Sequence, residues 1–389
     1  MDLKLDQWAT VLPTGFPGAI APSTGKKQEG FANGEEPAAG HVNHVFQAVA
    51  DVQQEVRAAI EGAGLTLSNL DNAQLDRAVK TLIGRGAEKR ALSGFQSIST
   101  GVAQALNALA SDGTSVVAVG NAGAVTSWAG TVSGAWVTRA PGSIYGGNFA
   151  AVYFDAVHNL WIAGGAGGEI QTAPPAMTPW TRRNNTGGDV TSIAGSAAGV
   201  IVAGMAGAPY LKRSADGVTY TSPTPSHAAS IHEVAYGAGV FVAVTVDGYV
   251  MYSVDGTTWT TGISSPSAGG QGHVAYHPDW GFIATYEQFA FHSINGMTWT
   301  SIQNAMPTAE SGFSAARGAL VLTPHAWRVI FTGATSGFWG WHTTTVNAAP
   351  DFKTAGARMG AIARICIFND QAWAVNGADD KVYVSSPIA

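Results

Sequence analysis

A large aromatic residue recurs along this chain at intervals of about 40 residues, a length typical of structural repeats. The positions are Trp136, Trp180, Tyr220, Trp259 and Trp299. The last three each end a short segment of the form S-x-D/N-G-x-T-W/Y, as in SVDGTTW at 253–259. Such a period indicates that the chain folds as copies of one small supersecondary unit.

Each aromatic position follows a glycine-punctuated run rich in β-forming residues. Such runs include SVVAVGNAG, NLWIAGGAGG, GVIVAGMAG and GVFVAVTVDG, and each continues into a further strand such as YVMYSVDG or FAFHSING. The 49 glycines of the chain favour tight turns between short strands. Short strands with tight turns, repeated at this period, are typical of the blades of a β-propeller.

Two less regular units follow the five clear ones. RVIFTGATSGFWGWHTTT leads to an aromatic at Phe352, after an insertion that makes this interval longer than the others. The last unit, RICIFNDQAWAVNGADDKVYVSSPIA, supplies three strands before the chain ends. The segment ALSGFQSIST (91–100) is available as the missing fourth strand, because Phe95 lies one repeat length ahead of Trp136. Pairing the two ends in one sheet would close the ring and remove a frayed last blade.

We therefore predict a mainly β fold for residues 91–389, a seven-bladed β-propeller whose N-terminal strand closes the last blade. The count of seven depends on that closure, and six or eight blades are the alternatives. The repeated aromatic residues are predicted to fill the wedges between blades: Phe95, Trp136, Trp180, Tyr220, Trp259, Trp299 and Phe352. In the turns, Asp or Asn is expected to bond the following backbone amides, and glycine to take the positive φ. Asp255 and Trp259 are thus predicted to be scaffold.

Charge density divides the chain near residue 90. Residues 91–389 carry only 26 charged side chains, whereas the much shorter segment 1–90 carries 20. Residues 1–40 hold four prolines among glycines without a sustained period, and we expect an extended arm there. Residues 41–90 are expected to be helical. Together these two segments form a small, partly extended N-terminal attachment region.

Valines in the first predicted helix recur with the spacing of a coiled coil. They are Val42, Val45, Val49, Val52 and Val56. β-Branched residues at both seam positions favour a homotrimer. The alternative is an intrachain hairpin, in which this helix packs on DNAQLDRAVKTLIG (71–84) through Leu75, Val79 and Leu82.

Composition excludes several classes of function. A net charge of −6 without a basic run argues against nucleic-acid binding. The start has no basic-then-apolar leader, and no stretch approaches the ~20 apolar residues of a membrane span, so we expect synthesis in the cytosol without membrane insertion. The single Cys366 excludes an intramolecular disulfide and a cysteine-rich zinc site. His273 and His277 lie in a strand-like segment, about 13 Å apart, too far to share one ion. We expect no metal and no cofactor.

The turns resemble the Asp-box of sialidases and related propellers, with one residue fewer between Asp and Gly. The matching positions are Ser253, Asp255, Gly256, Thr258 and Trp259, with further copies at 214–220 and 293–299. In that family the box is a structural turn on the face away from the active site. The resemblance therefore implies a propeller and not a chemistry.

The N-terminal region resembles the head of bacteriophage tail-fibre and tail-tip proteins. The positions that match are Gly30, Phe31, Gly34, Glu35, Pro37 and Asn43, followed by Gln74, Leu75, Ala78 and Val79. The resemblance covers under a fifth of the chain. It implies a structural protein of the virion tail, assembled in the host cytoplasm. Such a protein would dock to other tail or baseplate proteins through residues 1–90 and adsorb to a host glycan or protein receptor through its propeller.

The alternative is a sialidase-like or other glycan-degrading enzyme that acts on the host surface polysaccharide. Such an enzyme needs paired carboxylates, and the four glutamates of residues 91–389 form no recognisable pair in the sequence. The early Arg-Ile-Pro signature of sialidases is also absent. We therefore expect binding, with no catalytic residues.

Recognition is expected on the face opposite the repeated turns, where loops enter each blade and the middle hairpins lie. Aromatic and planar polar side chains at such places suit sugar rings or a protein partner. The candidates are Tyr145, Arg182, Arg183, Asp247, Tyr286, Glu287, Trp339 and Trp341. The last two belong to the Phe338–His342 region, which we predict to be a loop.

Overall fold

The computed structural model divides the chain into two units between residues 83 and 84, and every residue described below belongs to the second. The described residues are 95–128, 135–139, 146–264, 272–278, 281–286, 289–302, 318–322, 327–332, 337–342, 352–355, 363–369 and 371–385. For Ile302 and for residues 318–355 the description covers the backbone alone. The predicted arm at 1–40, the helical region at 41–90 and the valine seam lie outside the described residues.

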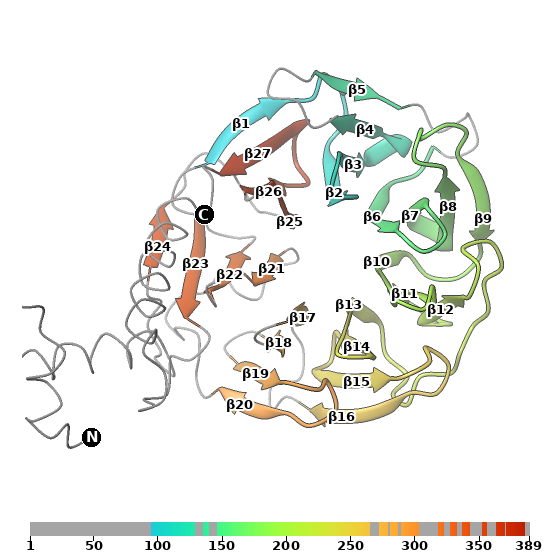
Figure 1. The fold of residues 1–389 in the computed structure, drawn as a ribbon, viewed down its shortest axis with the longest axis vertical. Helices are drawn as coiled ribbons and strands as arrows, with labels where there is room; N and C mark the ends of the chain where they lie inside the picture. Colours follow the sequence, from blue (N-terminus) through green and yellow to red (C-terminus); the bar gives the residue numbers. More distant parts are fainter. Residues whose placement is uncertain are drawn as a thin grey trace, which may run out of the picture. The chain divides into compact units, whose positions relative to one another are not determined.

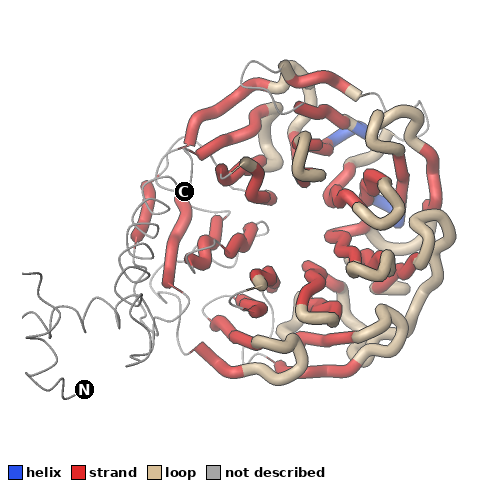
Figure 2. The backbone as a smooth tube through the Cα atoms, in the orientation of Figure 1, coloured by secondary structure: helices blue, strands red, loops and turns tan. Residues whose placement is uncertain are grey.

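Among the described residues, nearly all regular structure is antiparallel β-sheet, with two short helical turns (Figure 2). Six sheets have four strands and one has three. The first strand of each sheet is the innermost: β2 (Leu106–Ser111), β6 (Phe149–Asp155), β10 (Val190–Gly195), β13 (Ile231–Gly237), β17 (Gly272–His277), β21 (Gly318–Leu322) and β25 (Arg364–Phe368). Each inner strand contacts the next, and β25 contacts β2, so the sheets form a closed ring (Figure 1).

The second strands are β3 (Val116–Gly120), β7 (Leu160–Gly165), β11 (Ile201–Met205), β14 (Val240–Thr245), β18 (Gly281–Tyr286), β22 (Trp327–Thr332) and β26 (Gln371–Val375). The third strands are β4 (Val125–Trp128), β8 (Glu169–Ala173), β12 (Leu211–Ser214), β15 (Tyr249–Ser253), β19 (Phe289–Ser293), β23 (Gly337–His342) and β27 (Lys381–Ser385). The outer strands are β5 (Trp136–Thr138), β9 (Thr181–Asn185), β16 (Thr260–Ser264), β20 (Thr300–Ile302), β24 (Phe352–Ala355) and β1 (Phe95–Ser99). The helical turns η1 (Asn121–Gly123) and η2 (Ala166–Gly168) connect second to third strands.

The predicted closure by an N-terminal strand is confirmed. Strand β1 pairs antiparallel with β27, from Phe95 opposite Ser385 to Ser99 opposite Lys381. The sheet order is β1-β27-β26-β25, so the first strand of the ring is the outer strand of its last sheet. In the three-stranded sheet, an isolated bridge between Arg213 and Thr221 lies beyond β12, where the other sheets have a fourth strand.

The second strands are buried on both faces because each sheet is covered by its neighbours. Every residue of β3, β11, β14 and β18 is buried, and so is every residue of β7 except Leu160, which is partly buried. This burial explains why these strands appear in the sequence as continuous apolar runs without alternation. Glycines permit the close approach: a Cβ added at Gly164 or Gly204 would lie 2.3 Å from Val190 Cγ1 or 2.6 Å from Ile231 Cγ2 of the next inner strand.

The repeated turns have one hydrogen-bond pattern in three successive sheets. In the turn after β15, Asp255 Oδ1 accepts from the amides of Thr257 (2.7 Å) and Thr258 (2.9 Å), and Ser253 Oγ accepts from the Gly256 amide (2.9 Å). Gly256 has a φ of 72°. Equivalent bonds fix the turns that follow β12 and β19.

The repeated aromatic residues differ in their degree of burial. Trp180 and Trp259 are buried, with 3% and 6% of their surface exposed. Phe95, Trp136, Tyr220 and Trp299 are partly buried, and Phe352 begins β24. The indole of Trp259 donates to Gly256 O at 3.1 Å, and that of Trp299 to Gly296 O at 3.1 Å. No helix among the described residues is long and apolar enough to cross a membrane.

Candidate functional site

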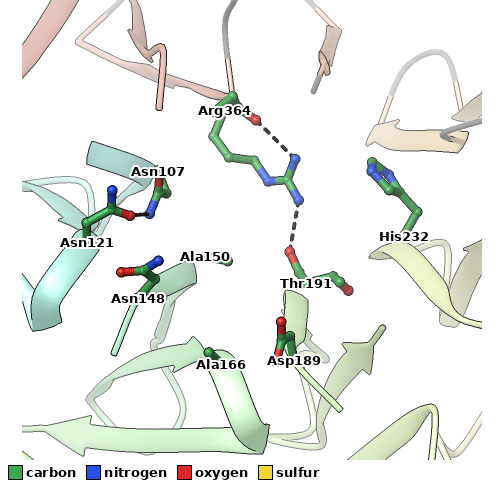
Figure 3. A pocket seen from close by; sticks show the side chains of 10 residues that line it. Asn107, Asn121, Asn148, Ala150, Ala166, Asp189, Thr191, His232 and Arg364 are labelled. Carbon is green, nitrogen blue, oxygen red and sulfur yellow. Dashed lines mark hydrogen bonds between the residues drawn. The ribbon is translucent and has the colours of Figure 1, made fainter. Parts of the chain in front are cut away.

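A cavity of about 290 Å³ lies at the centre of the ring, at the end where the inner strands begin. We call it the hub cavity (Figure 3). Its lining residues come from inner strands and from the connections beside them: Asn107, Asn121, Asn148, Ala150, Ala166, Asp189, Thr191, His232, Ala363 and Arg364. In each sheet, the connection from the second strand to the third lies at the same end of the ring as the hub cavity. The turn from the third strand to the fourth lies at the opposite end. The repeated S-x-D/N-G turns follow third strands, so they lie on the face opposite the hub cavity.

A β-bulge places one lining residue in each of four successive inner strands. The pairing register shifts across residue 107 in β2, residue 150 in β6, residue 191 in β10 and residue 232 in β13. These are Asn107, Ala150, Thr191 and His232, which all line the hub cavity. A bulge leaves its extra residue outside the ladder and re-aims the side chain. The same backbone device therefore presents four different side chains to one space.

Backbone hydrogen bonds repeat around the same end of the ring. The first amide of the second-to-third connection donates to the residue that precedes an inner strand: Asn121 to Ala105, Ala166 to Asn148, Ala206 to Asp189 and Val246 to Ser230, at 2.8–3.0 Å. Two side chains add to this pattern. Asn148 Oδ1 accepts from Ala122 N at 3.1 Å, and Asp189 Oδ1 accepts from Gly167 N at 2.8 Å. The backbone bonds extend the pairing within each sheet, whereas the two side-chain bonds join neighbouring sheets, and together they fix the cavity wall.

Arg364 crosses the centre of the ring (Figure 3). Its Nη2 donates to Thr191 O at 2.9 Å, and its Nη1 donates to Ala363 O at 3.1 Å. Arg364 begins β25 and Thr191 lies in β10, and in the ring these strands are separated by β2 and β6 on one side and by β13, β17 and β21 on the other. The guanidinium thus joins two non-neighbouring sheets and brings a positive charge to the hub.

Two histidines and a glutamate extend the polar wall beyond the cavity. His232 Nδ1 lies 2.6 Å from Gly272 O, and its ring meets that of His273 edge-on at 4.8 Å. Burial lowers the pKa of His232 to about 3, with further lowering from His273 and Arg364, so its imidazole is neutral at neutral pH. His273 Nδ1 lies 3.1 Å from Glu233 Oε2.

The carboxylate of Glu233 is ionised despite its surroundings. Burial raises the pKa of Glu233, but the charge of Arg364 and the contact with His273 outweigh it and lower the pKa to about 2. Glu233 Oε2 also accepts from Val274 N at 3.1 Å. No group of three His, Cys, Asp or Glu side chains suited to a metal ion occurs in the described part of the chain.

Several predicted surface residues lie elsewhere than expected. Tyr286 is 1% exposed, and its hydroxyl donates to Tyr249 O at 2.5 Å, so its prediction as a surface contact is corrected. Tyr286 ends β18 and packs against the preceding sheet, so its aromatic ring is buried between the two sheets. The Phe338–His342 region is strand β23, not a loop, so Trp339 and Trp341 occupy strand positions.

The two arginine candidates lie on the outer strand β9, away from the hub cavity. Arg182 Nε donates to Glu169 Oε1 at 2.9 Å, and Arg183 Nε donates to Thr172 Oγ1 at 2.8 Å. The sequence predicts a loop at Arg182–Asp189, but the structure places both arginines in a strand. Tyr145 and Glu287 lie outside the described residues.

Asp247 lies in the connection between β14 and β15, on the cavity side of the ring. It accepts hydrogen bonds from Thr245 Oγ1 at 2.6 Å and pairs with His227 Nε2 at 2.6 Å. The His227 ring stacks on Tyr249 with centroids 3.7 Å apart. Tyr286 donates a hydrogen bond to the backbone oxygen of the same Tyr249. The structure therefore brings two of the predicted residues, Asp247 and Tyr286, close to one another. The cluster does not line the hub cavity.

Sequence reasoning missed the residues of the hub cavity. Its inner-strand residues fall at 107, 150, 191 and 232, close to the period of the aromatic positions. An alignment of the repeats on their inner strands, rather than on the aromatic turns, would have shown that Asn, Ala, Thr and His occupy one equivalent position in four repeats.

No family model matches this chain, and no curated protein matches it. Its structure is similar to the crystal structure of the WD40 β-propeller domain of Doa1, with a TM-score of 0.59 and 16% identity over 76% of this chain and 97% of that one. It is also similar to YCF48 bound to D1 peptide, with a TM-score of 0.55 and 13% identity over 75% and 94%.

A third similar structure is the computationally designed Ika8 protein, with a TM-score of 0.50 and 14% identity over 75% of this chain and 99% of that one. At such identities the likeness shows the fold alone. The chain contains a β-propeller.

Proposed function

We propose that this chain is a bacteriophage tail-fibre or tail-tip protein. Residues 1–90 attach it to other tail or baseplate proteins and to sister chains in a homotrimer, and the propeller recognises the host surface during adsorption. The propeller has seven blades, with the three-stranded sheet counted as a blade that Thr221 completes. The likeness of the repeated turns to Asp-boxes belongs to the same proposal.

The observation that carries this function is the polar hub cavity on the loop face. Binding sites combine a concave shape with a few convergent polar groups held by a rigid scaffold. The hub cavity has amide, carboxylate, imidazole and guanidinium groups on its wall, fixed by bulges and by hydrogen bonds between sheets. The hub cavity lies on the face opposite the repeated turns, where the sequence analysis expects recognition. The tail assignment itself depends on the sequence resemblance in residues 28–84.

No specific observation favours the alternative of a glycan-degrading enzyme. Glycosidases use two carboxyl groups on either side of the scissile bond. Asp189 is the one carboxylate among the described residues that line the hub cavity, and its Oδ1 is engaged by the Gly167 amide. Glu169 is 2% exposed and pairs with Arg182. Incubation of the full-length protein with host polysaccharide, followed by measurement of released reducing sugar, is expected to show no release.

Immunogold electron microscopy tests the assignment to the virion. Antibody against the purified chain is applied to phage particles from bacteria that carry its gene, with antibody against an unrelated protein as the control. Label at the distal end of the tail is expected. Particles that carry no label at the tail would overturn the proposal.

Light scattering on the full-length protein tests the trimer. The expected mass is close to three times the 40.0 kDa of one chain. A monomer would remove the homotrimer from the proposal and favour the intrachain hairpin for the valine seam. Trimeric assembly would multiply weak single contacts through avidity.

A further inference from the structure

We propose that the hub cavity binds a single uncharged sugar ring through its hydroxyl groups. The biological setting of this site, a glycan on the host surface, rests on the proposed function. The site itself rests on the shape and chemistry of the cavity wall.

The wall offers both hydrogen-bond donors and acceptors at close range. Three side-chain amides line it, those of Asn107, Asn121 and Asn148, and an amide has an acceptor oxygen and a donor nitrogen, although both hydrogens of Asn107 Nδ2 are used within the protein. A sugar hydroxyl also donates and accepts, so it can match either end of an amide. His232 is held neutral by burial and therefore offers hydrogen bonding without a charge.

Asn107 provides an acceptor whose hydrogen bond is not made within the described residues. Its Nδ2 donates to Asn121 Oδ1 and to Phe149 O, each at 2.8 Å. These two bonds fix the orientation of the amide, and its Oδ1 is buried without a donor. Buried polar atoms are almost always paired. This oxygen has almost no accessible surface, so a ligand hydroxyl would supply the missing donor only if the Asn107 amide turned toward the cavity.

The charges of the wall nearly balance, which favours hydroxyls over an anion. Arg364 is positive and Asp189 is negative, and both line the cavity. Arg364 also interacts electrostatically with the carboxylate of Glu233 and lowers the pKa of Glu233. A carboxylate or phosphate entering the cavity would meet Asp189 as well as Arg364. An uncharged polar ring meets no such repulsion.

The size of the cavity sets the size of the ligand. At about 290 Å³ it lies just below the usual volume range of ligand pockets, which begins at about 300 Å³. Three alanines, Ala150, Ala166 and Ala363, form the recesses between the polar groups. The space thus suits one ring, and a longer glycan would present one ring here and leave the others in solvent.

Calorimetric titration of the full-length protein tests the site. The probes are glucose, galactose, N-acetylglucosamine and, as an acidic sugar of the same class, N-acetylneuraminic acid. We expect at least one uncharged sugar to bind with a dissociation constant of about 1 mM, as is usual for a ligand of about twelve heavy atoms. Absence of binding by all four, or binding by the acidic sugar alone, would overturn the proposal.

Filling the cavity locates the binding. Ala150→Leu is expected to weaken binding of the responding sugar more than tenfold, because the added side chain occupies the recess at the β6 bulge. Ala166→Leu changes an exposed residue of η2, so it leaves the fold intact and is expected to weaken binding about fivefold. Ala378→Leu is the control: this residue lies on the same side, between β26 and β27, but does not line the cavity.

These results separate the site from the proposed function. Unchanged sugar binding in both Ala150→Leu and Ala166→Leu would overturn the site. If no sugar binds while immunogold still labels the tail, the inference fails and the proposed function stands. If sugar binding is lost in the two cavity variants but phage tails carry no label, the inference stands and the proposed function fails.

Discussion

The two faces of the ring repeat in different ways. On the turn face, three successive sheets repeat both the side chains and the hydrogen bonds, with Ser214, Ser253 and Ser293 each followed by Asp or Asn and by Gly. On the face of the hub cavity, only the backbone repeats. The same bulge and the same amide-to-carbonyl bond recur, while the bulged residue changes from Asn to Ala, Thr and His.

This difference indicates which face is scaffold. Side chains that recur from sheet to sheet on the turn face serve what those sheets share, namely a closed turn and a filled wedge. Side chains that differ on an identical backbone are not required by the repeat, so they are free to specify a ligand. The comparison predicts that substitutions on the turn face cost stability, and that substitutions in the hub cavity change binding with little effect on stability.

The largest effect is expected at Trp259, where a turn meets the core. This side chain is 6% exposed and belongs to the cluster that contains Phe241 and Met251. Trp259→Ala is expected to lower the free energy of unfolding by about 3–5 kcal/mol, through lost burial and the cavity it leaves. Urea denaturation measures this loss. Trp299→Ala, at a less buried copy of the position, should cost less, and a loss below about 1 kcal/mol at Trp259 would contradict the scaffold role.

A smaller loss is expected from Asp255→Ala. The variant removes the acceptor of the Thr257 and Thr258 amides, and an exposed cap of this kind contributes about 1–2 kcal/mol. The chain provides its own control, because Asn295 accepts the same two amide bonds in the next sheet. Asp255→Asn should therefore remain within about 0.5 kcal/mol of the wild type. Equal losses for Ala and Asn would show that the hydrogen bonds are not what the turn needs.

The turns should also respond to acid. Backbone amide bonds lower the pKa of Asp255, chiefly those from Thr258 and Thr257, and the pKa of Asp216 is lowered by the equivalent bonds. A carboxyl whose pKa is lower in the folded state stabilises the fold above its unfolded pKa, and this contribution is lost as pH falls through the folded pKa.

Thermal unfolding measured from pH 5 downward tests this dependence. Starting near the ordinary aspartate value of 3.8, stability is expected to fall in the wild type, and more steeply than in an Asp216→Asn, Asp255→Asn double variant. The Asn295 turn contributes nothing to the slope, because its amide does not titrate. Identical slopes for the two proteins would show that the turns do not control the acid response.

The smallest change in stability is expected in the hub cavity. Asn121→Ala removes the acceptor of one bond from Asn107 Nδ2, which keeps its other bond to Phe149 O. We expect a change of about 0.5 kcal/mol or less in the free energy of unfolding. A loss as large as that of Asp255→Ala would break the contrast between the two faces.

The repeat made the architecture predictable. The regular recurrence of an aromatic residue indicated the blades, and the missing strand of the last unit identified 91–100 as its partner, which the β1–β27 pairing confirms. These features are local in sequence, or follow from the edge that an open ring would leave.

The site was less predictable because it depends on contacts between distant repeats. Arg364 and Thr191 are 173 residues apart, and no local pattern links them. Tyr286 appeared exposed because it stands beside a predicted turn, yet its hydroxyl reaches a carbonyl of the neighbouring sheet. The bulges that aim Asn107 and His232 at the hub are shifts of register, which the order of residues does not reveal.

The shared last sheet also sets the timing of assembly on the ribosome. Strand β1 is among the first parts of the ring to be made, but its partner β27 is the last strand and ends at Ser385. At about 5–20 residues per second, β1 waits roughly 15–60 s for that partner. A nascent chain released before residue 381 would carry two open sheet edges. Such incomplete products are expected to aggregate or be degraded, so only finished copies reach the soluble pool.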